Sequence, residues 1–204
     1  MKTVFCNAAQ QSAPPDRLRR RVSFTVSYQM PNRAEVKSAH ELSVLHAGLA
    51  EHNRIHSLSL SVISQPDPPD AILSDGLITT WMELTDAFFS PEWARDLNSY
   101  AADEQHKPMA KGLYMDMDAQ LASAFCEIVI QKYQKSSYKP FITEYGPGIL
   151  VVGLESPWLS DDTIDEIDRE WAHRGNLDIS ETFSHVYIGY RNASGNQAFK
   201  WPRS

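Results

Sequence analysis

The stretch that most constrains the fold is a continuous apolar run at residues 149–154 (Ile-Leu-Val-Val-Gly-Leu), which follows a Gly-Pro-Gly turn. A run that is apolar at every position is typical of a strand covered on both faces. Helices must then lie on both sides of the sheet, and helical patterns occur before and after this run. The sequence therefore predicts an α/β fold, a mixed central β-sheet flanked by helices.

Alternation and helical periodicity place the other elements around this strand. Residues 22–28 and 57–63 alternate apolar and polar side chains, as half-buried strands do. An apolar stripe of Leu42, Leu45 and Leu49 predicts a helix over 33–52. Further helices are expected from Asp116 or Asp118 to Lys139, over 163–174 and near Pro91, and further strands at 183–190 and 197–201. We expect a loosely structured segment, 1–21, and then one domain, 22–204.

The composition is ordinary for a soluble globular protein, with 42% hydrophobic and 22% charged residues. No apolar stretch of the sequence approaches the length of a membrane span. Cys6 and Cys126 are the only cysteines, and two cysteines so far apart do not make a disulfide framework. These features favour a cytoplasmic protein with free thiols.

Charge is unevenly distributed along the chain. The formal net charge is −7, but the first 60 residues contain eight basic and four acidic residues. The acidic balance of the whole chain argues against a dedicated nucleic-acid binder. The one dense basic cluster could contact phosphates, although a solvated charged segment is the simpler interpretation. This cluster consists of Arg17, Arg19, Arg20 and Arg21.

A β-hairpin predicted at 65–87 brings two carboxylates together. Two apolar runs flank a Ser-Asp-Gly turn at 74–76, where Gly supplies a positive φ. Because side chains alternate along a strand, Asp70 on the first strand and Glu83 on the second can share one face. Glu83 stands in an apolar strand, where a carboxylate is costly to bury unless it is paired or metal-bound. The hairpin therefore predicts a hard-cation site on Asp70 and Glu83.

Together these features resemble the PD-(D/E)XK nuclease superfamily. Its layout is a helix carrying a Glu, a Pro-Asp at the start of a hairpin, a Glu-x-Lys on the next strand, and then a helix and a strand. In this sequence the pieces are Glu41, Pro69-Asp70 and Glu83-Leu84-Thr85. The chain also resembles a bacterial subgroup with a Glu-x-Thr-x-Ala strand, in which the following helix has an Ile-Lys-Lys-Tyr pattern. The matching residues are Ile128, Lys132, Lys135 and Tyr138.

The resemblance implies a restriction-endonuclease-like fold and metal-dependent hydrolysis of phosphodiester bonds in nucleic acid, with DNA favoured. It implies that Asp70 and Glu83 bind Mg²⁺ or Mn²⁺, and that Glu41 completes the shell directly or through a water. Such an ion polarises a phosphate oxygen and lowers the pKa of a water molecule. Many nucleases that cut both strands act as dimers, so a homodimer is also open.

One residue departs from the family pattern, because Thr85 stands where a strand Lys is usual. Either Lys132 or Lys135, on one face of the following helix, takes over the role of that lysine, or the site is impaired. An impaired protein would act by binding nucleic acid or another protein, for example in bacterial defence or toxin neutralisation. In a third interpretation the chain is an unrelated α/β binding domain, in which Asp70 caps a turn.

A weaker pattern involves the histidines His46, His52 and His56. His52 and His56 are four residues apart, a spacing that suits two metal ligands on one helix face. No third ligand is evident in the sequence. Structural or solvent-facing histidines are therefore the simpler interpretation.

Overall fold

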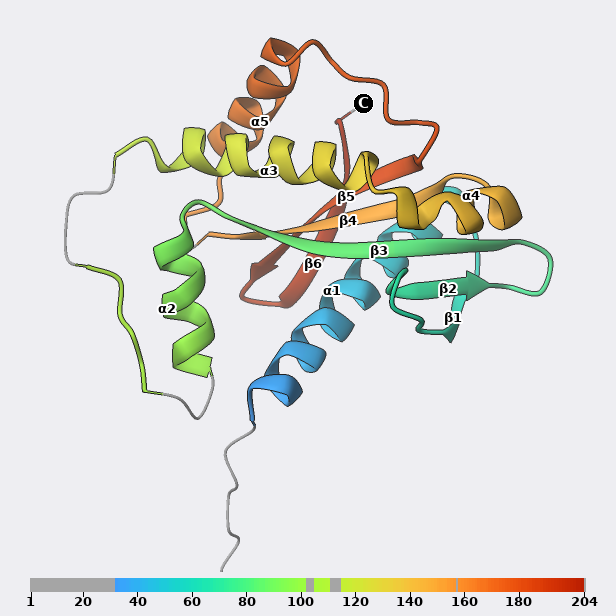
Figure 1. The fold of residues 1–204 in the computed structure, drawn as a ribbon, viewed down its shortest axis with the longest axis horizontal. Coiled ribbons are helices and arrows are strands. Elements are labelled where there is room, and N and C mark those ends of the chain that lie inside the picture. The colour runs from blue at the N-terminus through green and yellow to red at the C-terminus, as the bar shows by residue number, and fades with distance from the viewer. Residues whose placement is uncertain (1–31, 102–104, 111–114, 157, 204) are drawn as a thin grey trace, which may run out of the picture.

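The computed structural model describes residues 32–101, 105–110, 115–156 and 158–203. The strands are β1 (Ser61–Ser64), β2 (Ala71–Ser74), β3 (Thr79–Phe88), β4 (Gly148–Glu155), β5 (Phe183–Asn192) and β6 (Gly195–Trp201). The helices are α1 (Arg33–His56), α2 (Pro91–Ala101), α3 (Met117–Tyr133), the 3-10 helix η1 (Ser136–Tyr138), α4 (Lys139–Tyr145) and α5 (Asp161–His173). The strands form one mixed sheet flanked by helices, so the expected α/β fold is confirmed (Figure 1).

The strands lie in the sheet in the order of the sequence, β1 to β6. The first three form an antiparallel meander, β4 and β5 run parallel to β3, and β6 returns antiparallel to β5. Residues 148–154 of β4 are all buried, as the continuous apolar run predicts. The carboxyl ends of β3, β4 and β5 therefore lie at one edge of the sheet.

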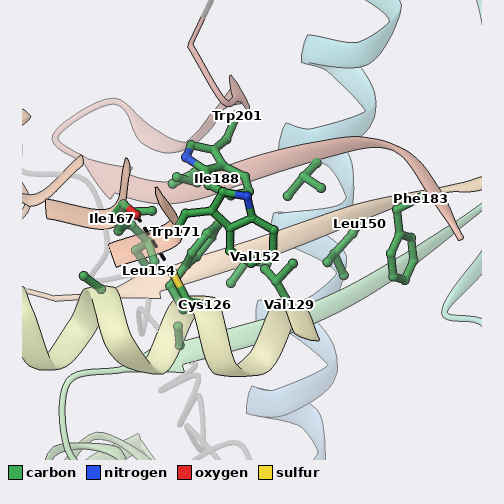
Figure 2. Close-up of a cluster of buried hydrophobic side chains, with 14 of the residues drawn as sticks. Cys126, Val129, Leu150, Val152, Leu154, Ile167, Trp171, Phe183, Ile188 and Trp201 are labelled. Carbon is green, nitrogen blue, oxygen red and sulfur yellow. Dashed lines mark hydrogen bonds between the residues drawn. The ribbon is translucent and has the colours of Figure 1, made fainter. Parts of the chain in front are cut away.

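One face of the sheet is covered by α3 and α5. Figure 2 shows buried side chains of the apolar cluster on this face. Cys126 of α3 lies against α5, with its Sγ atom 3.9 Å from the carbonyl oxygen of Ile167. Large side chains from helices and strands fill the space between them, and each contributes about 1.5–3 kcal/mol by its burial. They include Val129, Leu150, Val152, Trp171, Ile188 and Trp201.

The opposite face is covered by α1. Val44, Leu45 and Leu49 of this helix are buried against apolar side chains of β2 to β5. Leu42, which the sequence places in the same stripe, is instead 42% exposed. The two faces thus have separate cores, one under α1 and one under α3.

The predicted helix that ends at Lys139 is wrong in its extent. α3 stops at Tyr133, and a new helix, α4, begins at Lys139 with Pro140 in its first turn. Proline is tolerated there because the first N–H groups of a helix have no intrahelical acceptor, so this proline starts a helix rather than ending one. Lys135 therefore lies beyond α3, immediately before η1.

The predicted strand at 57–63 starts late, because α1 continues to His56. Ser57 then adopts a left-handed conformation, φ 54°, and its N–H bonds the Asn53 carbonyl. The expected strand at 22–28, the segment 1–21 and its arginine cluster lie outside the described residues. Among the residues that are described, no helix combines the length and apolarity needed to cross a membrane.

Candidate functional site

The hairpin of β2 and β3 places Asp70 and Glu83 on the same face of the sheet. Ala71 pairs with Met82, so Asp70 lies one step beyond this pair, next to Glu83. Trp81, two residues before Glu83, belongs to the core under α3, whereas Met82 belongs to the core under α1. The predicted phasing of the two carboxylates is therefore confirmed, and both face α3.

A hydrogen bond fixes the Asp70 carboxylate at the open end of the hairpin. The Leu84 N–H donates to Asp70 Oδ2 at 2.6 Å. The two residues before Asp70 are prolines, which lack an N–H and cannot extend the ladder. The Asp70 side chain thus accepts the Leu84 N–H, which a neighbouring strand would otherwise accept, and its second oxygen, Oδ1, can contact another partner.

Glu83 is the most buried carboxylate of this site, at 3% exposure. The Lys132 ammonium of α3 lies 2.5 Å from Glu83 Oε1, and the Lys135 ammonium lies 3.7 Å from the same oxygen. Lys132 Nζ is also 3.4 Å from the Leu84 carbonyl oxygen. Both lysines that the sequence offered in place of the strand lysine therefore meet Glu83, and Lys132 is the closer.

Two polar atoms next to this ion pair have no hydrogen-bond partner among the described residues. They are Glu83 Oε2 and the hydroxyl oxygen of Tyr138, both buried. Burial first, and then a side-chain interaction with the nearby Glu83 carboxylate, raise the pKa of Tyr138 above its ordinary value, so the hydroxyl lies close to this carboxylate although no well-formed hydrogen bond joins them. An unpaired buried carboxylate oxygen costs free energy, so Glu83 Oε2 is suited to accept a further ligand.

Burial raises the pKa of Asp70 to about 6. The Leu84 N–H opposes this shift, the Glu83 carboxylate adds to it, and the Lys132 ammonium opposes it. A carboxyl with this pKa is ionised at neutral pH and binds a proton in mildly acidic solution. Ligand binding that needs the ionised form must therefore weaken below about pH 6.

We expect Asp70→Asn to raise the free energy of unfolding, without added metal, by about 1–2 kcal/mol at neutral and higher pH. Folding raises the pKa of the Asp70 carboxyl from 3.8 to about 6. The stability that the protonated carboxyl contributes is therefore fully present below pH 3.8 and is lost as the pH rises through about 6. The uncharged amide still accepts from the Leu84 N–H. The extra free energy of unfolding of Asp70→Asn should therefore grow as the pH rises from about 4 to 6 and be absent in more acidic solution. Urea unfolding at several pH values measures it.

Asp75, in the turn of the same hairpin, provides a control of opposite sign. The N–H groups of Ile78 and Leu77 lower its pKa, so its contribution is present above the unfolded pKa and is lost in acid. Asp75→Asn should therefore destabilise at neutral pH. A gain from Asp70→Asn that is equal at all pH values would contradict the raised pKa of Asp70.

Of the two remaining predicted site residues, Thr85 lies beside the carboxylates and Glu41 lies outside their cluster. Glu41, on α1, is 44% exposed and lies 3.3 Å from the Lys37 ammonium. Its carboxylate does not join Asp70 and Glu83 in a cluster with all ligand atoms within 4.8 Å, among the residues described. It acts on Asp70 only as a weak charge that raises the pKa. Thr85 follows Glu83 on the same side of β3, half-buried.

A second polar cluster lies at the carboxyl ends of β3 and β4. His40 Nε2 is 3.1 Å from Asp86 Oδ1 and 3.6 Å from Glu155 Oε1. The hydrogen bond to Asp86 raises the pKa of His40, and burial raises that of Glu155. The three residues line a cavity of 780 Å³ that also includes Glu41 and Arg191. The carboxyl edge of parallel strands is a common ligand position in α/β sheets.

Sequence reasoning missed this cluster, although a signal was present. Asp86 and Glu155 each stand at the end of a strand that the sequence indicates, and neighbouring parallel strands bring such ends together. His40 could not be added, because the rotation of α1 about its axis depends on tertiary packing.

The chain matches no protein-family model, and comparisons with curated proteins and with solved structures give no match either.

Proposed function

We propose that this protein is a metal-dependent nuclease of the restriction-endonuclease-like fold, which hydrolyses phosphodiester bonds of nucleic acid, with DNA favoured. The observation that carries the proposal is the convergence of Asp70, Glu83 and Lys132 on one face of the hairpin. The order of helix, three-stranded meander, helical segment and parallel strand resembles the layout of that superfamily, although the α-helices α2, α3 and α4 lie between the meander and β4. Lys132, from α3, supplies the ammonium group that Thr85 does not.

The residues present fit Mg²⁺ or Mn²⁺. Asp70 and Glu83 offer hard carboxylate oxygens, and the buried Glu83 Oε2 has no hydrogen-bond partner within the described ranges. These two residues would hold the ion, and Glu41 stays outside this set. When bound, the ion would polarise a phosphate oxygen and lower the pKa of a water molecule.

The side chains of the chain itself have separate tasks in this proposal. Lys132 fixes Glu83 Oε1 and places a positive charge beside the reacting phosphate. Lys135 is 43% exposed, and its ammonium lies over the Tyr138 ring at 5.0 Å, where it can meet the phosphate backbone. Asp70 must be ionised, so activity should fall as the pH drops through about 6.

The test is cleavage of plasmid DNA, single-stranded DNA and RNA with Mg²⁺ or Mn²⁺. We expect Asp70→Asn, Glu83→Gln and Lys132→Met each to lower the rate by at least about 100-fold. Glu127→Gln changes an exposed carboxylate on α3 and serves as the control. Cleavage that needs no metal, or that survives both Asp70→Asn and Glu83→Gln, would contradict the proposal.

A second candidate is a catalytically impaired nuclease-fold protein that binds another protein or nucleic acid. It is favoured by the ion pairs of Glu83, whose Oε1 already contacts the ammonium groups of Lys132 and Lys135 without a metal ion. The acidic first turn of α5, at Asp161 and Asp162, offers a surface for a basic partner. For this candidate we expect no cleavage and no Mn²⁺ binding at Asp70.

For either candidate we propose a cytoplasmic location, in keeping with the free, buried thiol of Cys126.

A further inference from the structure

Three histidine side chains meet at the C-terminal end of α1, on the opposite face of the sheet from Glu83. His52 and His56 lie one turn apart on α1, and His185 lies on β5. Their ring centroids are 4.6 Å apart for His52–His56, 4.4 Å for His56–His185 and 5.1 Å for His52–His185. One ring nitrogen of each histidine lies within 4.8 Å of those of the other two. His185 is the third histidine that the sequence pattern lacked.

Hydrogen bonds occupy Nδ1 of two of the three rings. His52 Nδ1 lies 2.9 Å from the hydroxyl oxygen of Tyr187, which leaves His52 Nε2. His185 Nδ1 lies 3.0 Å from Ser184 Oγ, whose hydroxyl donates to the Gly148 carbonyl at 3.1 Å. The Ser184 oxygen therefore accepts the His185 Nδ1–H, and the lone pair of His185 is on Nε2.

His56 Nε2 is buried and has no hydrogen-bond partner among the residues described. A buried polar atom without a partner needs an explanation, and an ion is one of the ordinary ones. The hydroxyl groups of Tyr187 and Ser184 hold the other two rings in place, and an oriented ring is what a metal-binding histidine needs. Three independent observations, namely the clustering, the oriented rings and the unpaired nitrogen, thus coincide.

We propose that His52, His56 and His185 bind a divalent transition-metal ion through three imidazole nitrogens, with Zn²⁺ favoured. Zinc–imidazole bonds of about 2.0–2.1 Å in a tetrahedral site place the ligand nitrogens roughly 3.3 Å apart. The three nitrogens lie within 4.8 Å of one another, so the rings must turn inward when an ion binds. A fourth position stays open for water or another ligand. Imidazole selects borderline ions, so this site and the carboxylate site of Asp70 and Glu83 take different metals.

The surroundings suit a cation at neutral pH. Burial first, and then neighbouring positive charge, lower the pKa of His52 and of His185 to about 4, so both rings are neutral, as ligands must be. α1 ends at His56, and the negative end of its dipole points at the site. The Lys200 ammonium acts on both rings and opposes a bound cation. Removal of this charge should therefore tighten binding.

The test uses the full chain without a histidine tag, freed of metal with a chelator. We expect one equivalent of Co²⁺ to give the visible absorption of a four-coordinate ion, and Zn²⁺ to displace it. At 100 times the Kd, Zn²⁺ should raise Tm by roughly 5–10 °C. His56→Gln and His185→Gln should each weaken binding by at least about 10-fold, and Lys200→Gln should strengthen it.

Two controls separate this site from its surroundings. His46→Gln changes an exposed histidine on the same helix and should leave binding unchanged. Asp70→Asn should also leave Zn²⁺ binding at the histidines unchanged, so the test of the histidine site does not depend on the nuclease proposal. Absence of Co²⁺ and Zn²⁺ binding to the unaltered protein would overturn the inference. Binding that survives His56→Gln and His185→Gln, or that Asp70→Asn abolishes, would also overturn it.

Discussion

Lys132→Met is expected to lower the free energy of unfolding by about 2–4 kcal/mol. The Lys132 ammonium lies 2.5 Å from the Oε1 of Glu83, a side chain only 5% exposed. Methionine keeps most of the volume but leaves this carboxylate without its close partner. The cost of an uncompensated buried charge exceeds the value of the pair itself. Urea or thermal unfolding at neutral pH without added metal measures the loss.

Lys135→Met is the matched control. Its ammonium contacts the same oxygen at 3.7 Å, but the side chain is 43% exposed, so we expect a cost of less than about 1 kcal/mol. Adding Glu83→Gln to Lys132→Met should recover most of the lost stability, because the buried charge is then gone. An equal cost for the two lysine variants would contradict the assignment of Lys132 as the partner of Glu83.

Gly148→Ala is the second change with a large expected effect, about 3 kcal/mol of destabilisation. A Cβ atom at Gly148 would lie 2.4 Å from two ring atoms of Trp81. The Trp81 ring cannot move away, because it is fully buried between aromatic side chains such as Tyr138 and Phe183. Its Nε1–H also donates to the Gly146 carbonyl at 2.9 Å.

Gly189→Ala, also on a buried strand, is the control for this prediction. The nearest atoms to a Cβ at Gly189 lie 3.6 Å away, an ordinary contact, so the change should cost much less. Because Trp81 lies two residues from Glu83 on the same face, Gly148→Ala should also weaken metal binding. Equal stability of the two alanine variants, measured by thermal unfolding, would show that Trp81 is free to shift.

The carboxylate pair could be predicted from the sequence because it depends on local rules. A Ser-Asp-Gly turn fixes the hairpin, and the two-residue period of a strand then puts Asp70 and Glu83 on one face. The sequence also predicts the helix that carries Lys132, which is the second helix after the hairpin, α3. Pro140 predicts the end of that helix, which would put Lys135 on it, but α3 ends at Tyr133 and Pro140 lies in the first turn of α4.

The polar clusters could be predicted only in part, because they depend on long-range packing. His52 and His56 were visible as a helical pair, but His185 joins them only when β5 lies under the end of α1. Long-range packing also keeps Glu41 out of the site in which the sequence places it. It fits the family pattern in sequence, yet α1 turns it towards Lys37 rather than towards Glu83.

Mn²⁺ titration of the metal-free protein at about pH 8, followed by calorimetry, tests the metal site of the nuclease proposal most directly. It is best done with His185→Gln in the background, so that the histidine cluster does not contribute. We expect one equivalent of Mn²⁺ to bind, at least about 10-fold more weakly with Asp70→Asn or Glu83→Gln, and more weakly as the pH falls through about 6. Equal affinity with and without the Asp70 carboxylate, or no binding at all, would contradict the proposed metal site.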